Sequence, residues 1–370
     1  MRIAILVNSS WNILNFRSSL IKALISAEHK VFVFAPFENT IEKIENLGCT
    51  YVPIENIRRK GKNPFRDILL IKELKKSFKK YKIELLLSYT IKPNIYGSIA
   101  AHFLGIASIC TVTGLGYSFL TKSSVNKVVI RLYRYAFSKA DIVVFQNPDD
   151  LNLFVDLELV SMDKVKLIYG SGIDTEQFQP ISNVKNSKRV DFLFIGRLLF
   201  DKGISELLNA AKELTEVNND IQLHVVGDFD KNNPASIDEG WLQKFKNNNN
   251  ITFYGYQDNV KPYIEMSDVV ILPSYREGLP RVMLEALSME KPVITTDVPG
   301  CREVVDNEKN GFLVPVKSST HIAEAMIKMA SLSKNERNQM GKHGRVLALR
   351  KFSTEIINSN YLILVNNLRE

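Results

Sequence analysis

Cysteine is scarce in this sequence of 370 residues, and long apolar runs are missing. Only Cys49, Cys110 and Cys301 occur, at spacings that fit no metal-binding motif. So few cysteines argue against a disulfide framework and indicate a reducing compartment. No apolar run reaches the roughly 18 residues of a membrane span, and Met1-Arg2 leads directly into an apolar segment. We therefore expect neither a transmembrane helix nor a signal peptide.

The glycine-rich fingerprint of dinucleotide-binding proteins is also missing. Residues 8–17 follow the first predicted strand, where GxGxxG would stand, and they contain no glycine. This absence counts against a nicotinamide-dependent dehydrogenase. The composition is otherwise that of an ordinary globular protein, with 45% hydrophobic and 24% charged residues, and the length allows two domains.

The net charge of +8 resides wholly in the first half of the chain. Residues 1–180 contain 24 Lys and Arg against 16 Asp and Glu, whereas residues 181–370 contain 24 of each. The excess is densest from Arg58 to Lys82, where eleven basic residues face only Asp67 and Glu73.

Three interpretations of the Arg58–Lys82 stretch are open. The simplest is a solvated helix face. A nucleic-acid patch is disfavoured, because aromatic residues do not interleave with the cations as stacking platforms. We favour contact with an anionic membrane surface, to which each cation contributes about 1 kcal/mol. Phe65 and Ile68 are available to insert there if the core does not need them.

Strands and helices alternate along the chain, which predicts an α/β fold with mostly parallel sheets covered by helices on both faces. A polar, aperiodic segment at 180–188 predicts a linker. We therefore expect domains at 1–180 and 181–346, followed by one or two final helices in 347–370. Helices are predicted at 17–27, 41–47 and 63–81, the last with Phe65, Ile68, Ile71, Leu74 and Phe78 on one side. Predicted strands are 2–7, 31–35, 50–54, 83–88, 107–112, 141–146, 165–169, 190–195, 221–226, 251–254, 269–272, 293–295 and 312–314.

The stretch from Ser274 to Val298 carries the strongest functional pattern. It follows an apolar strand at 269–272 and predicts a loop, a helix from Arg281 to Met289, and a further strand. Loops at the carboxyl ends of parallel strands are where such sheets bind ligands, and helix-start N–H groups can receive phosphate oxygens. Glu277 in the loop could then accept hydrogen bonds from a sugar, and Glu285 from a ribose diol. The alternative is a surface turn followed by an exposed helical glutamate.

Three other strand ends in the second half carry candidate site residues. Gly196-Arg197 and Lys202-Gly203 place two cations beside a helix start, which suits a diphosphate, although a solvated basic loop has the same composition. Gly227 precedes an Asp-x-Asp pair, Asp228 and Asp230, for which we favour nucleotide-loop contact from Gly227 over metal binding. Tyr256 follows the strand at 251–254 and is a candidate for contact with a base, or for ordinary packing.

The Glu-x7-Glu spacing, with Gly-Leu-Pro after the first Glu and the text LEAL…KPVI…NGFLV downstream, resembles the signature of retaining GT-B glycosyltransferases of family 4, also called group 1. The resemblance implies two Rossmann-like domains facing a central cleft, with the last helix returning to the first domain. It implies a catalytic set of Arg197, Lys202 and Glu277, with Arg197 and Lys202 on the donor diphosphate. Donor-binding residues would be Gly196, Gly227, Tyr256, Gly278, Leu279, Pro280 and Glu285.

Two segments of the first half extend the resemblance. The text TIKPNIYG at 90–97 and Thr113 to Tyr117 are similar to bacterial enzymes that build lipid-linked surface polysaccharides. In that setting Gly114 and Gly116 would line the cleft near the donor sugar. Acceptor contacts would come from Asn8, Trp11, Asn12, Thr90 and Lys92. Many relatives carry a histidine in the loop at 88–97 and this chain has none there, so no catalytic base is named.

The resemblance implies a retaining transferase that moves a hexose or N-acetylhexosamine from a nucleotide-diphospho sugar, UDP by family precedent, to a polyprenyl-diphosphate-linked glycan. The family works without an essential metal, so we expect no cofactor, and protein cations and helix dipoles would stabilise the leaving diphosphate. We expect a cytoplasmic protein held peripherally at the inner face of the plasma membrane, with no nucleic-acid partner. The alternatives are a GT-B sugar-nucleotide epimerase, which needs no acceptor, and a non-catalytic membrane-bound adaptor.

Overall fold

The computed structural model of the chain describes all residues except 58–63, 116–123, 182–187, 216–219, 231–232 and 370. The chain divides into two compact units. The first comprises Met1–Gly172 and Thr354–Glu370, and the second comprises Ile173–Ser353. The linker predicted at 180–188 falls within the span of the second unit, and its residues 182–187 lie outside the described part.

The first unit is built on a seven-stranded parallel sheet with the order β3-β2-β1-β4-β5-β6-β7. Its strands are mainly apolar, as expected where helices cover both faces; Ile3, Ala4, Ile5 and Leu6 of β1 are all fully buried. The strands are β1 Arg2–Leu6, β2 Lys30–Ala35, β3 Thr50–Pro53, β4 Leu85–Tyr89, β5 Ala107–Val112, β6 Ile142–Phe145 and β7 Val165–Leu167.

Two separate apolar cores cover the two faces of this sheet. One contains side chains from α1 Ser10–Phe16, α2 Ser18–Ser26, α3 Ile41–Glu45 and α15 Thr354–Asn367. The other contains side chains from α4 Pro64–Lys80, the π-helix Pro93–Gly97, α5 Ser98–His102, α7 Ser124–Lys139 and α8 Pro148–Asp156. The unit is thus a three-layer α/β/α sandwich.

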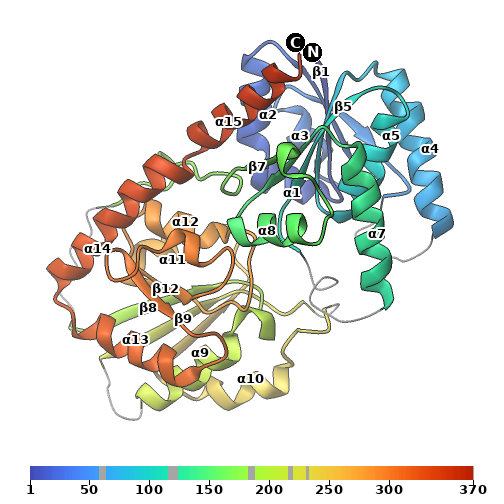
Figure 1. Cartoon of the computed structure of the whole chain (residues 1–370). Helices are drawn as coiled ribbons and strands as arrows, with labels where there is room; N and C mark the ends of the chain where they lie inside the picture. The colour runs from blue at the N-terminus through green and yellow to red at the C-terminus, as the bar shows by residue number, and fades with distance from the viewer. Residues whose placement is uncertain (58–63, 116–123, 182–187, 216–219, 231–232, 370) are drawn as a thin grey trace. The chain divides into compact units, whose positions relative to one another are not determined.

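The last helix of the chain belongs to the first unit. After α14 Lys334–Leu347 and a π-helical turn at Ala348–Phe352, α15 packs against α2 (Figure 1). The Tyr361 hydroxyl of α15 lies 3.0 Å from the Thr111 hydroxyl of β5, and both side chains are buried. The expected return of the last helix to the first domain is therefore confirmed.

The second unit repeats the plan with a six-stranded parallel sheet in the order β10-β9-β8-β11-β12-β13. Two helices, α9 and α13, pack against each other, and α12 packs against α14. The strands are β8 Val190–Ile195, β9 Ile221–Val226, β10 Ile251–Gly255, β11 Val269–Leu272, β12 Val293–Thr296 and β13 Gly311–Val314. The helices are α9 Ile204–Thr215, α10 Glu239–Lys246, α11 Lys261–Met266, α12 Arg281–Ser288 and α13 Ser319–Ser331, with α14 before the crossover.

Both sheets reverse their strand order at one point, between β1 and β4 in the first unit and between β8 and β11 in the second. In open parallel sheets the carboxyl ends of the strands at such a switch point form the usual ligand site. The two candidate regions of the chain are therefore fixed by topology alone.

Two predictions from the sequence are wrong. No helix was predicted between the strand at 2–7 and the helix at 17–27, but α1 Ser10–Phe16 forms there, capped by the Ser9 side chain, which accepts a hydrogen bond from the Asn12 N–H. In α4 the apolar residues predicted to lie on one side do not share a face, because Phe65 and Ile68 are 78% and 53% exposed whereas Leu74 and Phe78 are buried. Leu70, Leu74 and Phe78 are the buried residues of that helix.

Candidate functional site

Two loops meet at the switch point of the second unit. Gly196–Lys202 follows the end of β8, and Ser274–Glu277 follows the end of β11, the strand that pairs directly with β8. The Tyr275 N–H donates to the Asp201 carbonyl at 2.9 Å and ties the loops together. Lys202 and Glu277, which are 75 positions apart in sequence, are thereby brought into contact.

Lys202 and Glu277, both predicted as catalytic, form an ion pair between these loops. The Lys202 ammonium donates to Oε1 of Glu277. The Ser274 hydroxyl donates to the same oxygen at 2.6 Å. The side chains of Lys202 and Glu277 are 22% and 14% exposed, so the pair is largely withdrawn from water while one side remains open. Removing either partner would leave the other charge half-buried and unmatched.

Glycine at two positions allows this close approach of the loops. Gly203 has φ +68°, and a Cβ there would lie 2.0 Å from the Pro273 carbonyl oxygen. Gly300 has φ +83°, and a Cβ there would lie 2.4 Å from the Glu277 carbonyl oxygen. Any other residue would push the loop carrying Glu277 away from Lys202.

Arg197 forms an ion pair with Asp230, with Nη1 and Oδ2 2.7 Å apart. Asp230 belongs to the Asp-x-Asp pair after β9, and its companion Asp228 accepts the Phe229 N–H. The acidic side chain therefore holds the guanidinium of a predicted diphosphate-binding residue. Within the described ranges no group of three or more His, Cys, Asp or Glu side chains is arranged to hold a metal ion.

Glu285 lies on α12, and its residue exposure is only 7%. The Arg281 guanidinium donates to it at 2.9 Å. Burial raises the pKa of the Glu285 carboxyl to about 6, and the Arg281 charge opposes that rise. Glu285 is therefore no exposed helical glutamate, the alternative that the sequence left open. Pro280, in an extended conformation, is the residue before the first turn of α12.

The remaining donor-site predictions are spread over the second unit. Gly278 and Leu279 are half-buried in the loop that carries Glu277. Gly227 follows β9 with φ +145°, and a Cβ there would lie 1.8 Å from the Gly196 carbonyl oxygen, so Gly196 and Gly227 are in contact. The Tyr256 ring is 64% exposed beyond the end of β10, and its hydroxyl donates to Asp258 at 2.8 Å.

The predicted acceptor residues follow the two strands at the switch point of the first unit. Asn8, Trp11 and Asn12 come after β1, with the Trp11 ring 55% exposed. Thr90 and Lys92 come after β4, and Thr90 has the unusual φ of +73°. Gly114 follows β5 with φ +108°, and Gly116 lies outside the described residues.

Two functional candidates were missed in the sequence. Asp67 on α4 receives the Lys92 ammonium at 2.8 Å and the Tyr96 hydroxyl at 2.6 Å, so Lys92 is engaged within the unit. Nothing in the sequence links Asp67 to Lys92, because the contact needs the folded helix layer. Ser274, in contrast, stands three residues before Glu277, and its hydroxyl could have been proposed as a partner from that spacing.

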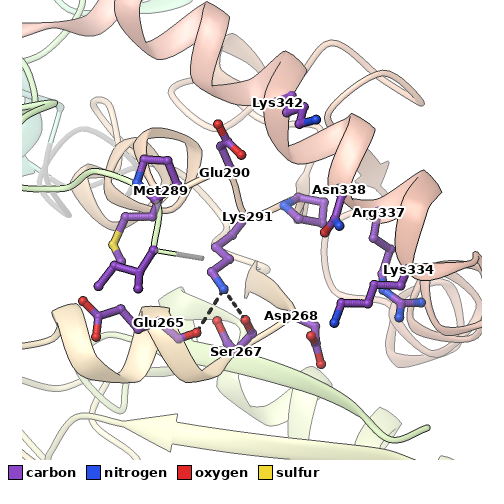
Figure 2. Close-up of a pocket in the computed structure, with 13 residues that line it drawn as sticks. Glu265, Ser267, Asp268, Met289, Glu290, Lys291, Lys334, Arg337, Asn338 and Lys342 are labelled. Atoms are coloured by element: carbon purple, nitrogen blue, oxygen red, sulfur yellow. Dashed lines mark hydrogen bonds between the residues drawn. The ribbon is translucent and has the colours of Figure 1, made fainter. Parts of the chain in front are cut away.

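A surface pocket of about 450 Å³ occupies a different part of the second unit (Figure 2). It is lined by Ser267 and Asp268, just before β11, and by Lys291 and Pro292, just before β12. The Lys291 ammonium donates to the carbonyls of Glu265 and Ser267 at 3.1 and 2.6 Å (Figure 2). The pocket therefore lies at the amino ends of these strands, opposite the switch-point loops.

The helices of the structure were also compared with the length and apolarity that a membrane span requires. Among the described residues, no helix meets both requirements.

Comparisons with known proteins agree with this architecture. Residues 175–346 match the family model of group 1 glycosyl transferases, and residues 2–147 match the glycosyl transferase 4-like model. The chain is 28% identical to the N,N'-diacetylbacillosaminyl-diphospho-undecaprenol alpha-1,3-N-acetylgalactosaminyltransferase of Campylobacter jejuni, over 100% of this chain and 99% of the relative. It is 28% identical to the UDP-Gal:alpha-D-GlcNAc-diphosphoundecaprenol alpha-1,3-galactosyltransferase of Escherichia coli, over 74% and 76%.

Solved structures show the same fold. A glycosyltransferase from Rickettsia africae superposes with a TM-score of 0.81 at 18% identity, covering 100% of this chain and 98% of that one. The Anabaena protein HepE, crystallised with UDP, superposes with a TM-score of 0.80 at 17% identity, covering 99% and 100%. The two parallel α/β units are thus a GT-B fold, formed by a glycosyl transferase 4-like domain at 2–147 and a group 1 glycosyl transferase domain at 175–346.

Proposed function

We propose that this protein is a retaining glycosyltransferase that moves a hexose or N-acetylhexosamine from a UDP-sugar to a polyprenyl-diphosphate-linked glycan, without a metal ion. The main observation behind this proposal is the Lys202–Glu277 ion pair at the carboxyl ends of β8 and β11, in which the Ser274 hydroxyl also donates to the Glu277 carboxylate. At such a switch point the Lys202 ammonium can bind an anionic group of a ligand, and the Glu277 carboxylate can accept hydrogen bonds from ligand hydroxyls.

The geometry suits departure of a nucleoside diphosphate. As the bond to the leaving oxygen breaks, negative charge grows on the diphosphate, and Lys202 and Arg197 are the cations that would stabilise it. Each is held by a carboxylate in the free protein, Lys202 by Glu277 and Arg197 by Asp230. Glu277 would orient the donor sugar, and Glu285 would accept the ribose hydroxyls. The acceptor hydroxyl would attack the anomeric carbon from the face that the diphosphate leaves, so that the new glycosidic bond replaces the bond to the diphosphate on the same face. The leaving phosphate oxygen would receive the hydroxyl proton, and the anomeric configuration would be retained.

Substrate identity rests on the relatives. The Campylobacter and Escherichia enzymes are named for diphosphoundecaprenol-linked acceptors, and the Escherichia enzyme for a UDP-sugar donor. The Anabaena protein of the same fold was crystallised with UDP and with UDP-glucose. These names support a UDP-sugar and a lipid-diphosphate glycan as the substrates of this chain.

Helix α4 supports attachment to an anionic membrane. Its outward face begins with exposed apolar residues, Phe65, Ile68 and Leu69, which are 78%, 53% and 49% exposed. Lysines continue the same face at helical spacing, namely Lys72, Lys76 and Lys79, all exposed. This arrangement matches a helix that inserts apolar side chains and holds its cations at the lipid headgroups. Arg58 to residue 63 of the predicted basic stretch lie outside the described residues.

Nucleotide release by the purified protein tests the proposal. UDP- and GDP-sugars would be supplied with and without lipid-diphosphate-sugar acceptors, and the Glu277→Ala variant would run beside the wild type. Acceptor-dependent release from one UDP-sugar, lost in the variant, is the expected result. Release without acceptor would indicate an epimerase or hydrolase instead, and liposome binding without any release would indicate an adaptor. NMR of the product would show whether the anomeric configuration is retained.

A further inference from the structure

Arg17 is a buried cation at the switch point of the first unit. It stands between α1 and α2, and only 2% of its surface is exposed. Its guanidinium carbon lies 3.8 Å from the centre of the Tyr89 ring, at the end of β4. Nε is buried without a hydrogen-bond partner, and none of the ion pairs within the described ranges includes Arg17. The charge is therefore stacked on an aromatic face with no carboxylate to balance it.

Such an arrangement is costly for the folded protein alone. Burying a charge without a counter-ion destabilises the native state, and a cation–π contact offsets only part of that cost. The second unit offers a direct comparison, because its switch-point cation, Lys202, has Glu277 as a partner. Arg17, which contacts Tyr89 at the end of β4, has no carboxylate partner among the described residues.

Neither of the two helices that flank Arg17 has an acidic residue in its first turn. Arg17 is the residue before α2, a nine-residue helix whose start has no side-chain cap and no acidic residue in its first turn. The positive end of that helix adds to the field of the guanidinium. The Arg17 charge also opposes the burial that raises the pKa of Tyr361 on α15.

A buried polar group next to the Tyr89 ring is left unsatisfied as well. Thr90 follows Tyr89 directly, in the left-handed φ region, and its hydroxyl is buried without a partner. A residue in a strained backbone conformation and an unsatisfied hydroxyl, directly after the ring on which a buried cation is stacked, are typical of a ligand site.

We propose that Arg17 binds a phosphate group of a substrate, with Tyr89 holding the guanidinium plane and Thr90 hydrogen-bonding beside it. The stacked Tyr89 ring fixes the orientation of the planar Arg17 guanidinium, whose N–H groups can then donate two parallel hydrogen bonds to phosphate oxygens. The inference rests on the proposed function, since it makes Arg17 the phosphate-binding residue of the first unit. The phosphate can come from the lipid-diphosphate acceptor or from the nucleotide donor, and kinetics distinguish the two.

Three variants test the proposal. Arg17→Met removes the charge at similar volume, and Arg17→Lys keeps the charge but loses the planar fork. Lys22→Met is the matched control, because Lys22 is an exposed cation on the same helix α2. Melting temperatures would be measured with and without inorganic pyrophosphate, which needs no turnover, and the KM of donor and acceptor would be measured separately.

The expected result is that Arg17→Met melts no lower than the wild type without ligand and loses part of the stabilisation by pyrophosphate. One KM should rise by about 10- to 100-fold in that variant, as loss of a charge-assisted contact implies, and by less in Arg17→Lys. A rise for the acceptor alone identifies the lipid diphosphate, and a rise for the donor alone identifies the nucleotide. Lys22→Met should behave as wild type.

A purely structural role would give the opposite pattern. Arg17→Met would melt several degrees lower, respond to pyrophosphate as the wild type does and keep both KM values, which overturns the proposal. Should Arg17→Met fail to fold, an unchanged KM for both substrates in Arg17→Lys would overturn it equally. If no sugar is transferred by the wild type but pyrophosphate still stabilises it through Arg17, the proposed function fails while the anion site stands.

Discussion

The Lys202 ammonium and the Glu277 carboxylate meet across the neighbouring ends of β8 and β11, and both Lys202 and Ser274 donate to the same oxygen, Oε1. The pair holds Lys202, which we propose to bind the donor diphosphate, next to Glu277, which we propose to bind the sugar. A donor diphosphate would take over Lys202 and release Glu277 toward the sugar. The two residues should therefore act as one unit in catalysis.

A double-mutant cycle tests that coupling. We expect Lys202→Ala and Glu277→Ala each to lower kcat/KM by roughly 10- to 150-fold, as removal of a charge-assisted hydrogen bond of about 1.5–3 kcal/mol implies. The double variant should lose much less than the product of the two single losses, because each single variant leaves one half-buried charge unmatched. Steady-state kinetics with the preferred donor and acceptor give all four values.

Lys328→Ala is the control for this cycle. Lys328 pairs with Glu308 at 2.7 Å, but these side chains are 54% and 65% exposed, so the pair should contribute less than about 1 kcal/mol. Its kcat/KM should match the wild type. Strictly multiplicative losses in the Lys202 and Glu277 variants would show that the two groups act independently.

Gly203→Ala should destabilise the second unit far more than Gly255→Ala. Both glycines have φ +68°, so both substitutions incur the same left-handed strain of about 1–2 kcal/mol. Only at Gly203 would the new Cβ collide with a backbone atom, the Pro273 carbonyl oxygen at 2.0 Å, whereas the Cβ at Gly255 meets nothing within 4 Å. Thermal unfolding of both variants measures the difference, and equal melting temperatures would mean that the loop yields without cost.

The carboxyl of Glu285 should impose a pH dependence on stability. Burial raises its pKa from 4.5 to about 6, so the folded state holds the proton more tightly than the unfolded state between these pH values. Stability should therefore fall as pH rises through this window, by about 2 kcal/mol at 1.36 kcal/mol per pKa unit.

Glu285→Gln removes that component, and denaturant unfolding from pH 4 to 7 should show a flatter profile than the wild type. Glu324→Gln, which changes an exposed glutamate on α13, is the matched control and should leave the profile unchanged. Parallel curves for wild type and Glu285→Gln would show that Arg281 compensates the buried charge fully.

The sequence predicts most of this fold because buried parallel strands are short apolar runs bounded by turn residues. The strands at 190–195, 221–226 and 269–272 coincide with β8, β9 and β11. The strand order is not encoded in any local pattern, so the contact between Lys202 and Glu277 could be inferred only from a family resemblance. Their pairing depends on β11 lying beside β8 rather than beside β10.

Hydrophobic periodicity did not predict the buried face of α4, because this helix has two apolar stripes. Phe65 and Ile68 begin one stripe, and Leu70, Leu74 and Phe78 form the other, so the sequence pattern alone cannot say which faces the sheet. Arg17 was missed for a different reason, since an arginine between two short helices resembles any surface residue until its burial beside Tyr89 is known.

The outward stripe of α4 should govern membrane attachment. Phe65→Ser and Leu69→Ser replace apolar side chains that are 78% and 49% exposed, so the fold should survive. Affinity for vesicles containing anionic lipid should fall by about 10- to 150-fold in each variant, as loss of roughly 1.5–3 kcal/mol of apolar insertion implies. Phe37→Ser is the control, because Phe37 is 74% exposed in the same unit but lies outside α4. Sedimentation with vesicles of phosphatidylglycerol and phosphatidylcholine, at low and high salt, measures the vesicle affinity of the three variants. Insertion of α4 is supported if high salt weakens binding and only the two α4 variants lose affinity. An equal loss of affinity in Phe37→Ser would show that exposed aromatic residues outside α4 contribute as much, which contradicts a specific role for this helix.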